Sequence, residues 1–191
     1  MSRSRKHQVA TLLSLLVMFG VVACGDDTDP GEGPTSGSPD NLTTPGTALT
    51  VGETATVTRD GAGEVLEVTI TGIDRGSRSD LAALDLPAAR GKVPFFVRYE
   101  LQHVSGDSPY LPVNHFLSAW AGDTQLTQLA ILEPFPVCQE KTFSADVAAG
   151  TTVEGCATFV IDKGDPPLDR VQFSYGEDYD SFDGHQISWE Q

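Results

Sequence analysis

The chain has 191 residues, enough for one or two domains, and its formal net charge is −15 at neutral pH. The first 23 residues contain three basic residues and no acid, so the remainder has 9 basic and 27 acidic residues and a net charge of −18. Such a charge repels phosphate backbones and anionic membrane surfaces, which argues against a nucleic-acid partner. It would keep a secreted protein soluble, and a cation-collecting role is the alternative.

The N-terminus has the three parts of a secretory signal peptide. Residues 1–8 carry the positive charge, residues 9–23 form an uncharged apolar run, and small or compact residues follow at 23–25. The apolar run is short for a membrane-spanning helix, which needs about 20 residues. The sequence therefore predicts a signal peptide over residues 1–23.

A cysteine stands where this apolar run ends. The tetrapeptide Val21-Val22-Ala23-Cys24 resembles the bacterial lipobox. The resemblance implies that the Cys24 thiol receives a diacylglycerol, with acyl chains such as palmitate, and that cleavage makes Cys24 the first residue of the mature chain. Two acyl chains hold a soluble domain stably on a membrane. The expected location is extracytoplasmic, on the outer face of the cell membrane; the alternative is an ordinary signal peptide or an uncleaved anchor with an incidental cysteine.

Residues 24–47 are predicted to be the lipidated cysteine followed by a flexible tether. Gly, Pro, Ser, Thr and Asp dominate this segment, and Leu42 is its one large apolar residue. Such a composition cannot bury enough surface to offset the entropy of ordering the chain. A flexible chain of this length spans roughly 25–30 Å.

From Ala48 to the C-terminus the sequence is typical of successive β-strands. Apolar and polar residues alternate along EVLEVTITGI (64–73) and PFFVRYELQHV (94–104), as in strands with one buried face. Residues 121–123 predict a hairpin turn. About seven or eight strands fill residues 48–191, and their spacing favours an all-β antiparallel sandwich.

Residues 77–90 have the Ala/Leu composition of a helix. Ser79 or Asp80 is predicted to cap one short helical turn, which Pro87 would end.

The two remaining cysteines, Cys138 and Cys156, form an even pair in an oxidising compartment and predict one disulfide. Cys156 has the opposite parity to Ala157 and Phe159 in its strand, so its side chain should leave the apolar row and meet the segment PFPVC (134–138). In the chain-entropy model a disulfide that closes this loop adds on the order of 3 kcal/mol to the free energy of unfolding. A redox-active pair is the alternative, but the C-x-x-C spacing is missing.

The folded part resembles the immunoglobulin-like domain of unknown function found in envelope lipoproteins of actinobacteria and other Gram-positive bacteria. The resemblance rests on the order of five motifs: VGET (51–54), FFVRYELQHVSGDSP (95–109), FLSAWAGDT (116–124), AAGTTVEGCATFVI (148–161) and LDRVQFSYG (168–176). The resemblance implies an immunoglobulin-like sandwich in the cell envelope and supplies no catalytic residues. The pattern usually has an asparagine where this chain has His103.

Metal-ligand signals are weak in this sequence. His103, His115 and His185 share no ligand spacing, and His103 and His115 are expected in turns or on the surface.

Three closely spaced carboxylates, Asp178, Asp180 and Asp183, precede Gly184 and resemble oxygen-rich calcium loops. Their register departs from the EF-hand, so a solvated acidic loop is the alternative.

Catalytic signals are missing as well. The sequence has no G-x-S-x-G, S-x-x-K, P-loop or G-x-G-x-x-G motif, so we expect neither an enzyme nor a cofactor. The prediction is a surface-tethered binding or accessory module with an envelope protein partner. The alternative is an envelope hydrolase or a small-ligand carrier, which would need a pocket with convergent polar groups. Trp189 could close the core or stand exposed as a contact residue.

Overall fold

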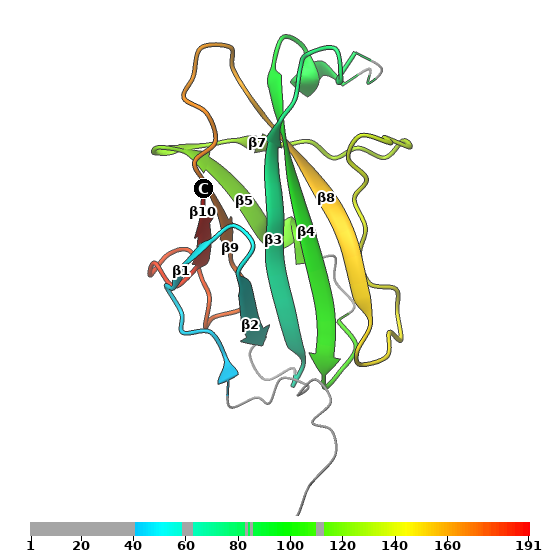
Figure 1. Ribbon diagram of the computed structural model, residues 1–191, viewed down its shortest axis with the longest axis vertical. Helices are drawn as coiled ribbons and strands as arrows, with labels where there is room; N and C mark the ends of the chain where they lie inside the picture. The colour runs from blue at the N-terminus through cyan, green and yellow to red at the C-terminus, as the bar shows by residue number, and fades with distance from the viewer. Residues whose placement is uncertain (1–40, 59–62, 83, 85, 110–112) are drawn as a thin grey trace, which may run out of the picture. The chain divides into compact units, whose positions relative to one another are not determined.

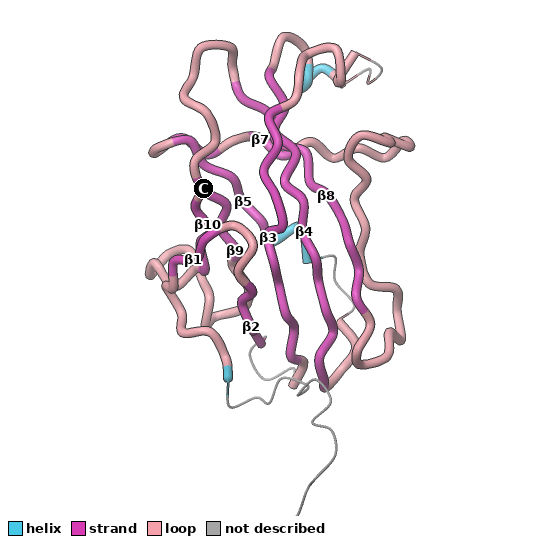
Figure 2. The backbone as a smooth tube through the Cα atoms, viewed as in Figure 1, coloured by secondary structure: helices cyan, strands magenta, loops and turns pink. Residues whose placement is uncertain are grey.

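The computed structural model describes residues 41–58, 63–82, 84, 86–109 and 113–191. Cys24, the predicted signal peptide and most of the predicted tether lie outside these residues. In the described part, ten strands form two five-stranded sheets that pack as a sandwich (Figure 1). Helix in these residues takes the form of short 3-10 segments, among them η2 (Pro87–Ala89) and η3 (Val113–Phe116) (Figure 2).

The A sheet has the strand order β1 (Ala48–Thr50), β10 (Ile187–Glu190), β9 (Arg170–Phe173), β5 (Leu117–Ala121) and β6 (Thr124–Gln125). The B sheet has the order β2 (Thr54–Thr58), β3 (Val65–Arg75), β4 (Val93–Ser105), β8 (Thr152–Ile161) and β7 (Thr127–Gln128). Every pair of neighbours is antiparallel except β1 and β10, which are parallel. The predicted all-β sandwich is confirmed, with more strands than the seven or eight expected.

The extra strands arise because two segments of strand-like sequence, ALTVGETATVTR (48–59) and TQLTQLAIL (124–132), each divide between the sheets. Gly52 adopts a φ of +101°, which favours glycine, and the N–H of Glu53 donates to the carbonyl of Thr50 at 2.9 Å. This tight turn sends β1 to the A sheet and β2 to the B sheet. The second division falls at the buried Leu126, between β6 on the A sheet and β7 on the B sheet.

The predicted hairpin at residues 121–123 is present, since β5 and β6 pair with Ala121 opposite Thr124. The structure of residues 77–90 differs from the single capped helical turn that the sequence predicts. The Asp80 carboxylate accepts the N–H of Ser77 at 2.7 Å, in a series of four-residue turns closed by hydrogen bonds between residues three apart. Pro87 begins η2 instead of ending a helix, because its fixed φ suits a first helical position.

Backbone contacts to the sandwich begin ahead of the predicted domain start at Ala48. The N–H of Thr43 donates to the carbonyl of Thr56 at 2.7 Å, and the hydroxyl of Tyr179 donates to the carbonyl of Thr43 at 3.0 Å. Gly46 N–H donates to the carbonyl of His185 at 2.8 Å.

The main core lies between the sheets and contains the apolar rows that alternation predicts. Leu66, Val68 and Ile70 of β3 are completely buried there. Trp189 is buried too, and its indole N–H donates to the carbonyl of Glu53 at 2.8 Å. Trp189 therefore closes the core and joins the last strand to the turn between β1 and β2.

Tyr99 of β4 crosses over Gly155 of β8, the residue opposite it in the ladder. A Cβ atom at Gly155 would lie 2.4 Å from the Tyr99 ring, so glycine is required for this close approach. The Tyr99 hydroxyl donates to the carbonyl of Lys141 at 2.9 Å, which ties the connection between β7 and β8 to the sheet. Burial raises the pKa of Tyr99 to about 12.

We expect Gly155→Ala to lower the free energy of unfolding by about 1–3 kcal/mol, because the Tyr99 ring must move. Gly72→Ala is the matched control: Gly72 also lies in a strand, but the nearest atom to its Cβ position is Arg98 Cδ at 4.0 Å. The control should be neutral or stabilising by up to about 1 kcal/mol. Urea denaturation measures both, and equal effects at the two positions would contradict the close approach.

Candidate functional site

The outer face of the B sheet carries a second apolar layer. Phe96 of β4 and Val160 of β8 point away from the main core and are nevertheless buried. They belong to a second cluster of Leu81, Ala89, Phe96, Leu129, Phe135, Cys138, Cys156 and Val160. The segment 129–140, which we call the cover segment, supplies Leu129, Phe135 and Cys138. It has no strand or helix of its own, so its position depends on contacts with the sheet.

The structure contains the disulfide that the sequence predicts. The sulfur atoms of Cys138 and Cys156 are bonded, the Cα atoms are 5.1 Å apart, and the two residues are separated by 18 positions. Cys156 belongs to the outer cluster, whereas its neighbour Ala157 belongs to the main core. The disulfide thus fastens the cover segment to β8.

Two backbone hydrogen bonds also hold the cover segment to β8. The N–H of Leu129 donates to the carbonyl of Thr158 at 2.8 Å, and the N–H of Cys156 donates to the carbonyl of Gln139 at 3.1 Å. The chain between Leu129 and Gln139 bulges away from the edge of β8. A cavity opens under this bulge.

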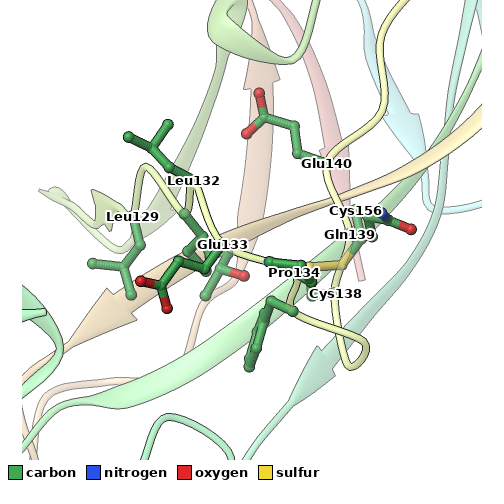
Figure 3. Close-up of a pocket in the computed structure, with 11 residues that line it drawn as sticks. Leu129, Leu132, Glu133, Pro134, Cys138, Gln139, Glu140 and Cys156 are labelled. Carbon is green, nitrogen blue, oxygen red and sulfur yellow. A yellow bond between two sulfur atoms is a disulfide. The ribbon is translucent and has the colours of Figure 1, made fainter. Parts of the chain in front are cut away.

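This cavity has a volume of about 240 Å³ and lies between the cover segment and the outer face of β8 (Figure 3). The disulfide forms part of its wall, and the carboxylates of Glu133 and Glu140 stand at separate points around it (Figure 3). Its lining residues are Leu129, Ile131, Leu132, Glu133, Pro134, Phe135, Cys138, Gln139, Glu140, Cys156 and Thr158.

Leu132 is the most unusual residue of the cover segment. Its side chain is 97% exposed, although it follows the partly buried Ile131. It also lines a neighbouring hollow of about 200 Å³, together with Leu84, Leu86, Ala130, Ile131 and Glu133. An exposed apolar side chain beside partly buried apolar groups around a concave surface is typical of a protein contact site. Sequence reasoning missed this site, because exposure in an irregular segment has no periodicity.

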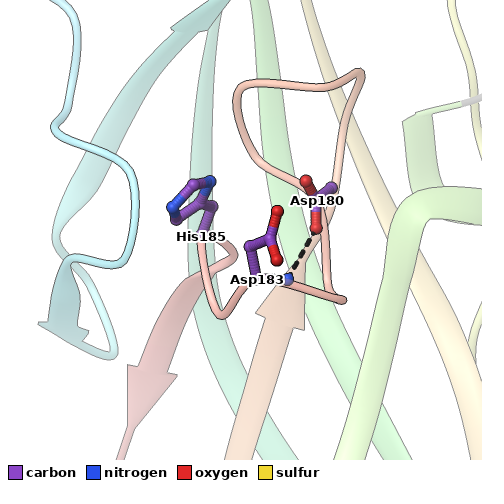
Figure 4. A group of neighbouring side chains, drawn as sticks. All are labelled: Asp180, Asp183 and His185. Atoms are coloured by element: carbon purple, nitrogen blue, oxygen red, sulfur yellow. Dashed lines mark hydrogen bonds between the residues drawn. The ribbon is translucent and has the colours of Figure 1, made fainter.

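The acidic loop brings together some of the predicted metal ligands. Side-chain ligand atoms of Asp180, Asp183 and His185 all lie within 4.8 Å of one another (Figure 4). Asp178 is not part of this group, and His185 takes its place. The N–H of His185 donates to the carbonyl of Asp180 at 3.1 Å, which closes the loop and brings the histidine beside the aspartates. Sequence reasoning missed His185 because this closure is not visible in the spacing of the residues.

Backbone hydrogen bonds account for the position of the Asp180 carboxylate. It accepts the N–H of Asp183 at 2.9 Å and that of Phe182 at 2.7 Å, which hold the pKa of Asp180 below its usual value. Two carboxylates and one imidazole suit a transition metal better than calcium, which takes six to eight oxygen ligands. Calcium binding at Asp178, Asp180 and Asp183 stays a prediction.

The expectation that His103 lies in a turn or on the surface is wrong. His103 is 2% exposed, because it has the same parity as Leu101 in β4 and so points into the sandwich. Its Nε2 lies 3.1 Å from the carbonyl of Ser105, and Nδ1 has no hydrogen-bond partner in the described residues. His115 is exposed as predicted, with its Nε2 3.5 Å from the Glu140 carboxylate.

A buried carboxyl group links the two sheets. Glu64 is completely buried just before β3, and it accepts a short hydrogen bond from the hydroxyl of Tyr175, which follows β9. Sequence reasoning missed Glu64, although it is in phase with the apolar row of Leu66 and Val68. The even spacing from Leu66 and Val68 could have shown that Glu64 is buried. A charged residue in a buried row needs a polar partner, so the same spacing could also have predicted such a partner.

In the part of the chain that the structure describes, no serine, threonine or cysteine side chain is hydrogen-bonded to a histidine. None of the helices found there is long and apolar enough to cross a membrane.

No protein-family model matches this sequence, and no curated protein matches it. The chain shares its fold with MPT63, a secreted protein of Mycobacterium tuberculosis. That match has a TM-score of 0.52 and 14% sequence identity, and it covers 75% of this chain and 96% of MPT63. At this level of identity the likeness concerns the fold alone.

Two further solved structures show a more distant similarity. YcdA of Bacillus subtilis is 17% identical with a TM-score of 0.43, over 71% of this chain and 39% of YcdA. An uncharacterised β-sandwich protein from Clostridium difficile is 16% identical with a TM-score of 0.43, over 81% of this chain and 99% of that one.

Proposed function

We propose that this protein is a lipid-anchored binding module of the cell envelope, and that the surface around Leu132 contacts its partner. The exposed Leu132 on the outer layer of the B sheet is the observation that carries the proposal. An isolated leucine on a surface would need no explanation. Here it adjoins two hollows, and the smaller one is lined mainly by apolar residues, among them Leu84 and Leu86.

The second fully exposed aromatic or aliphatic side chain of the described residues, Phe182, gives a useful contrast. Phe182 is also 97% exposed, but its neighbours Ser181 and Asp183 are exposed polar residues of the acidic loop. An apolar contact needs neighbours that exclude water around it. Leu132 has such neighbours in Ile131 and the leucines of the adjoining hollow, which favours the cover segment as the contact surface.

The anchor rests on the sequence around Cys24. A basic start, a short apolar run and a cysteine preceded by Ala23 coincide there. A diacylglycerol on Cys24 would keep the protein on the membrane surface, so that partners in the same envelope are met at high local concentration.

A photo-crosslinking experiment tests the contact surface. We expect p-benzoylphenylalanine in place of Leu132 to form a discrete adduct in envelope membranes of the native host, and the same group in place of Phe182 to form none. Once the adduct has identified the partner, Leu132→Ser in the protein without the crosslinker should weaken its affinity for that partner by about tenfold, as for an interface anchor. Identical adducts from both positions, or none from position 132, would overturn the proposed surface.

The anchor has its own test. Cys24→Ser should abolish metabolic labelling of the protein with a palmitate analogue, since no thiol is then available to receive the diacylglycerol. Mass spectrometry of the wild-type chain should show a diacylglycerol on Cys24 at its N-terminus. An intact leader with an unmodified thiol would refute the anchor.

A further inference from the structure

The connection between β3 and β4, at one end of the B sheet, carries positive charge on a strongly acidic chain (Figure 1). Residues 75–92 contain four of the nine basic residues that follow the predicted signal peptide, and two acids. The formal charge of this segment is therefore +2, whereas residues 24–191 as a whole have a net charge of −18. A local reversal of sign attracts anionic groups that the rest of the molecule repels.

Ion pairs neutralise part of this positive charge, but they leave out Arg78. The ammonium group of Lys92 lies 2.7 Å from the carboxylate of Asp162. The acid nearest to Arg78 in the sequence, Asp80, accepts the N–H of Ser77 at 2.7 Å. Arg78 itself is exposed and forms no ion pair with any other residue that the structure describes. Its guanidinium group is therefore available to a ligand.

Arg78 lines a hollow of about 470 Å³, which we call the basic hollow. Arg90 lines it as well, and Leu81 and Ala89, which are buried in the outer cluster, form its floor. None of its lining residues is acidic. A Cβ atom at Gly91, another lining residue, would have no other atom within 4 Å, so the backbone there is open to a ligand. A ligand that complements this hollow carries a negative charge.

The basic hollow is continuous with the surface around Leu132. Leu84 lines both the basic hollow and the hollow of about 200 Å³ that Leu132 borders. The floor of the basic hollow also belongs to the same outer cluster as the cover segment. A segment of a partner that contacts Leu132 can therefore extend over Leu84 to Arg78.

We propose that the basic hollow receives an aspartate or glutamate carboxylate of the partner protein, an assignment that rests on the proposed function. The planar guanidinium group of Arg78 can donate two parallel hydrogen bonds to a carboxylate, which fixes the orientation of the bound group. Apolar residues beside this carboxylate in the partner contact Leu84 and Leu132.

The net charge of the protein favours a protein carboxylate over a polyanion. Residues 24–191 have a net charge of −18, which repels phosphate polymers and anionic membranes. A single carboxylate on an apolar segment carries little charge, so it reaches Arg78 without this cost. The carboxylate thus sets the position of a contact whose apolar part lies around Leu132.

NMR titration of the full-length protein in micelles of an uncharged detergent tests the proposal. The probe is the peptide acetyl-Ala-Leu-Glu-Ala-amide, and the matched control peptide has glutamine in place of glutamate. We expect the glutamate peptide to shift the backbone amide signals of Leu81 and Gly91. It should bind about three- to fivefold more tightly than the control, as for an exposed ion pair, and added salt should reduce this preference.

Two arginine variants separate the basic hollow from a general effect of charge. Arg78→Gln should lower the preference for the glutamate peptide to less than about twofold, because the ion pair is lost. Arg75→Gln is the matched control, since Arg75 is an exposed arginine of the same segment that does not line the hollow. In this variant the preference should remain.

Three results would overturn the proposal: equal affinity for the two peptides, a preference that Arg78→Gln leaves unchanged, or no shifts at Leu81 and Gly91. Tighter binding of glycerol 3-phosphate than of the glutamate peptide at the same amides would also overturn it, because the hollow would then serve a phosphate ligand. A discrete adduct from position 132 alongside any of these results would leave the proposed function standing and remove the carboxylate site alone. The expected peptide results without such an adduct would remove the Leu132 surface and keep the carboxylate site.

Discussion

The part of the B sheet around Phe96 and Val160 is buried on both faces, and the rest of the structure depends on this constraint. Consecutive residues of β4, Phe95 and Phe96, belong to different clusters, one between the sheets and one outside. A strand with apolar side chains on both faces needs a covering layer on each side. The A sheet supplies one layer, and the cover segment, fastened by the disulfide at Cys156, supplies the other.

The sequence reveals the sandwich and the disulfide, but not everything that points inward. Alternation in β3 and the parity of Cys156 are local properties, so they could be predicted. His103 and Glu64 have the parity of the buried rows, but the polar character of His103 suggested the surface, and Glu64 was not singled out. Glu64 is buried with a tertiary partner, the hydroxyl of Tyr175. The chain passes from the A sheet to the B sheet at Leu126, and the sequence does not predict this change because the residues on both sides are compatible with a single strand.

The candidate site was out of reach of sequence reasoning for a different reason. It is formed where the cover segment bulges away from β8, between the hydrogen bonds at Leu129 and Gln139. A bulge of irregular chain leaves Thr158 unsatisfied and Leu132 exposed, and neither property follows from residue type. In the acidic loop the reverse holds, because its aspartates are conspicuous in the sequence. The structure explains the position of the Asp180 carboxylate by hydrogen bonds from backbone N–H groups of the same loop.

Hydrogen exchange of the full-length protein, oxidised and then reduced, measures most directly whether the disulfide holds this layer in place. The account predicts that reduction removes protection from residues 129–140, with the amide of Leu129 as a reporter. Strands β9 and β10 of the A sheet should keep theirs, since their ladder does not involve the cover segment. Unchanged protection over residues 129–140, or an equal loss in both sheets, would contradict the account.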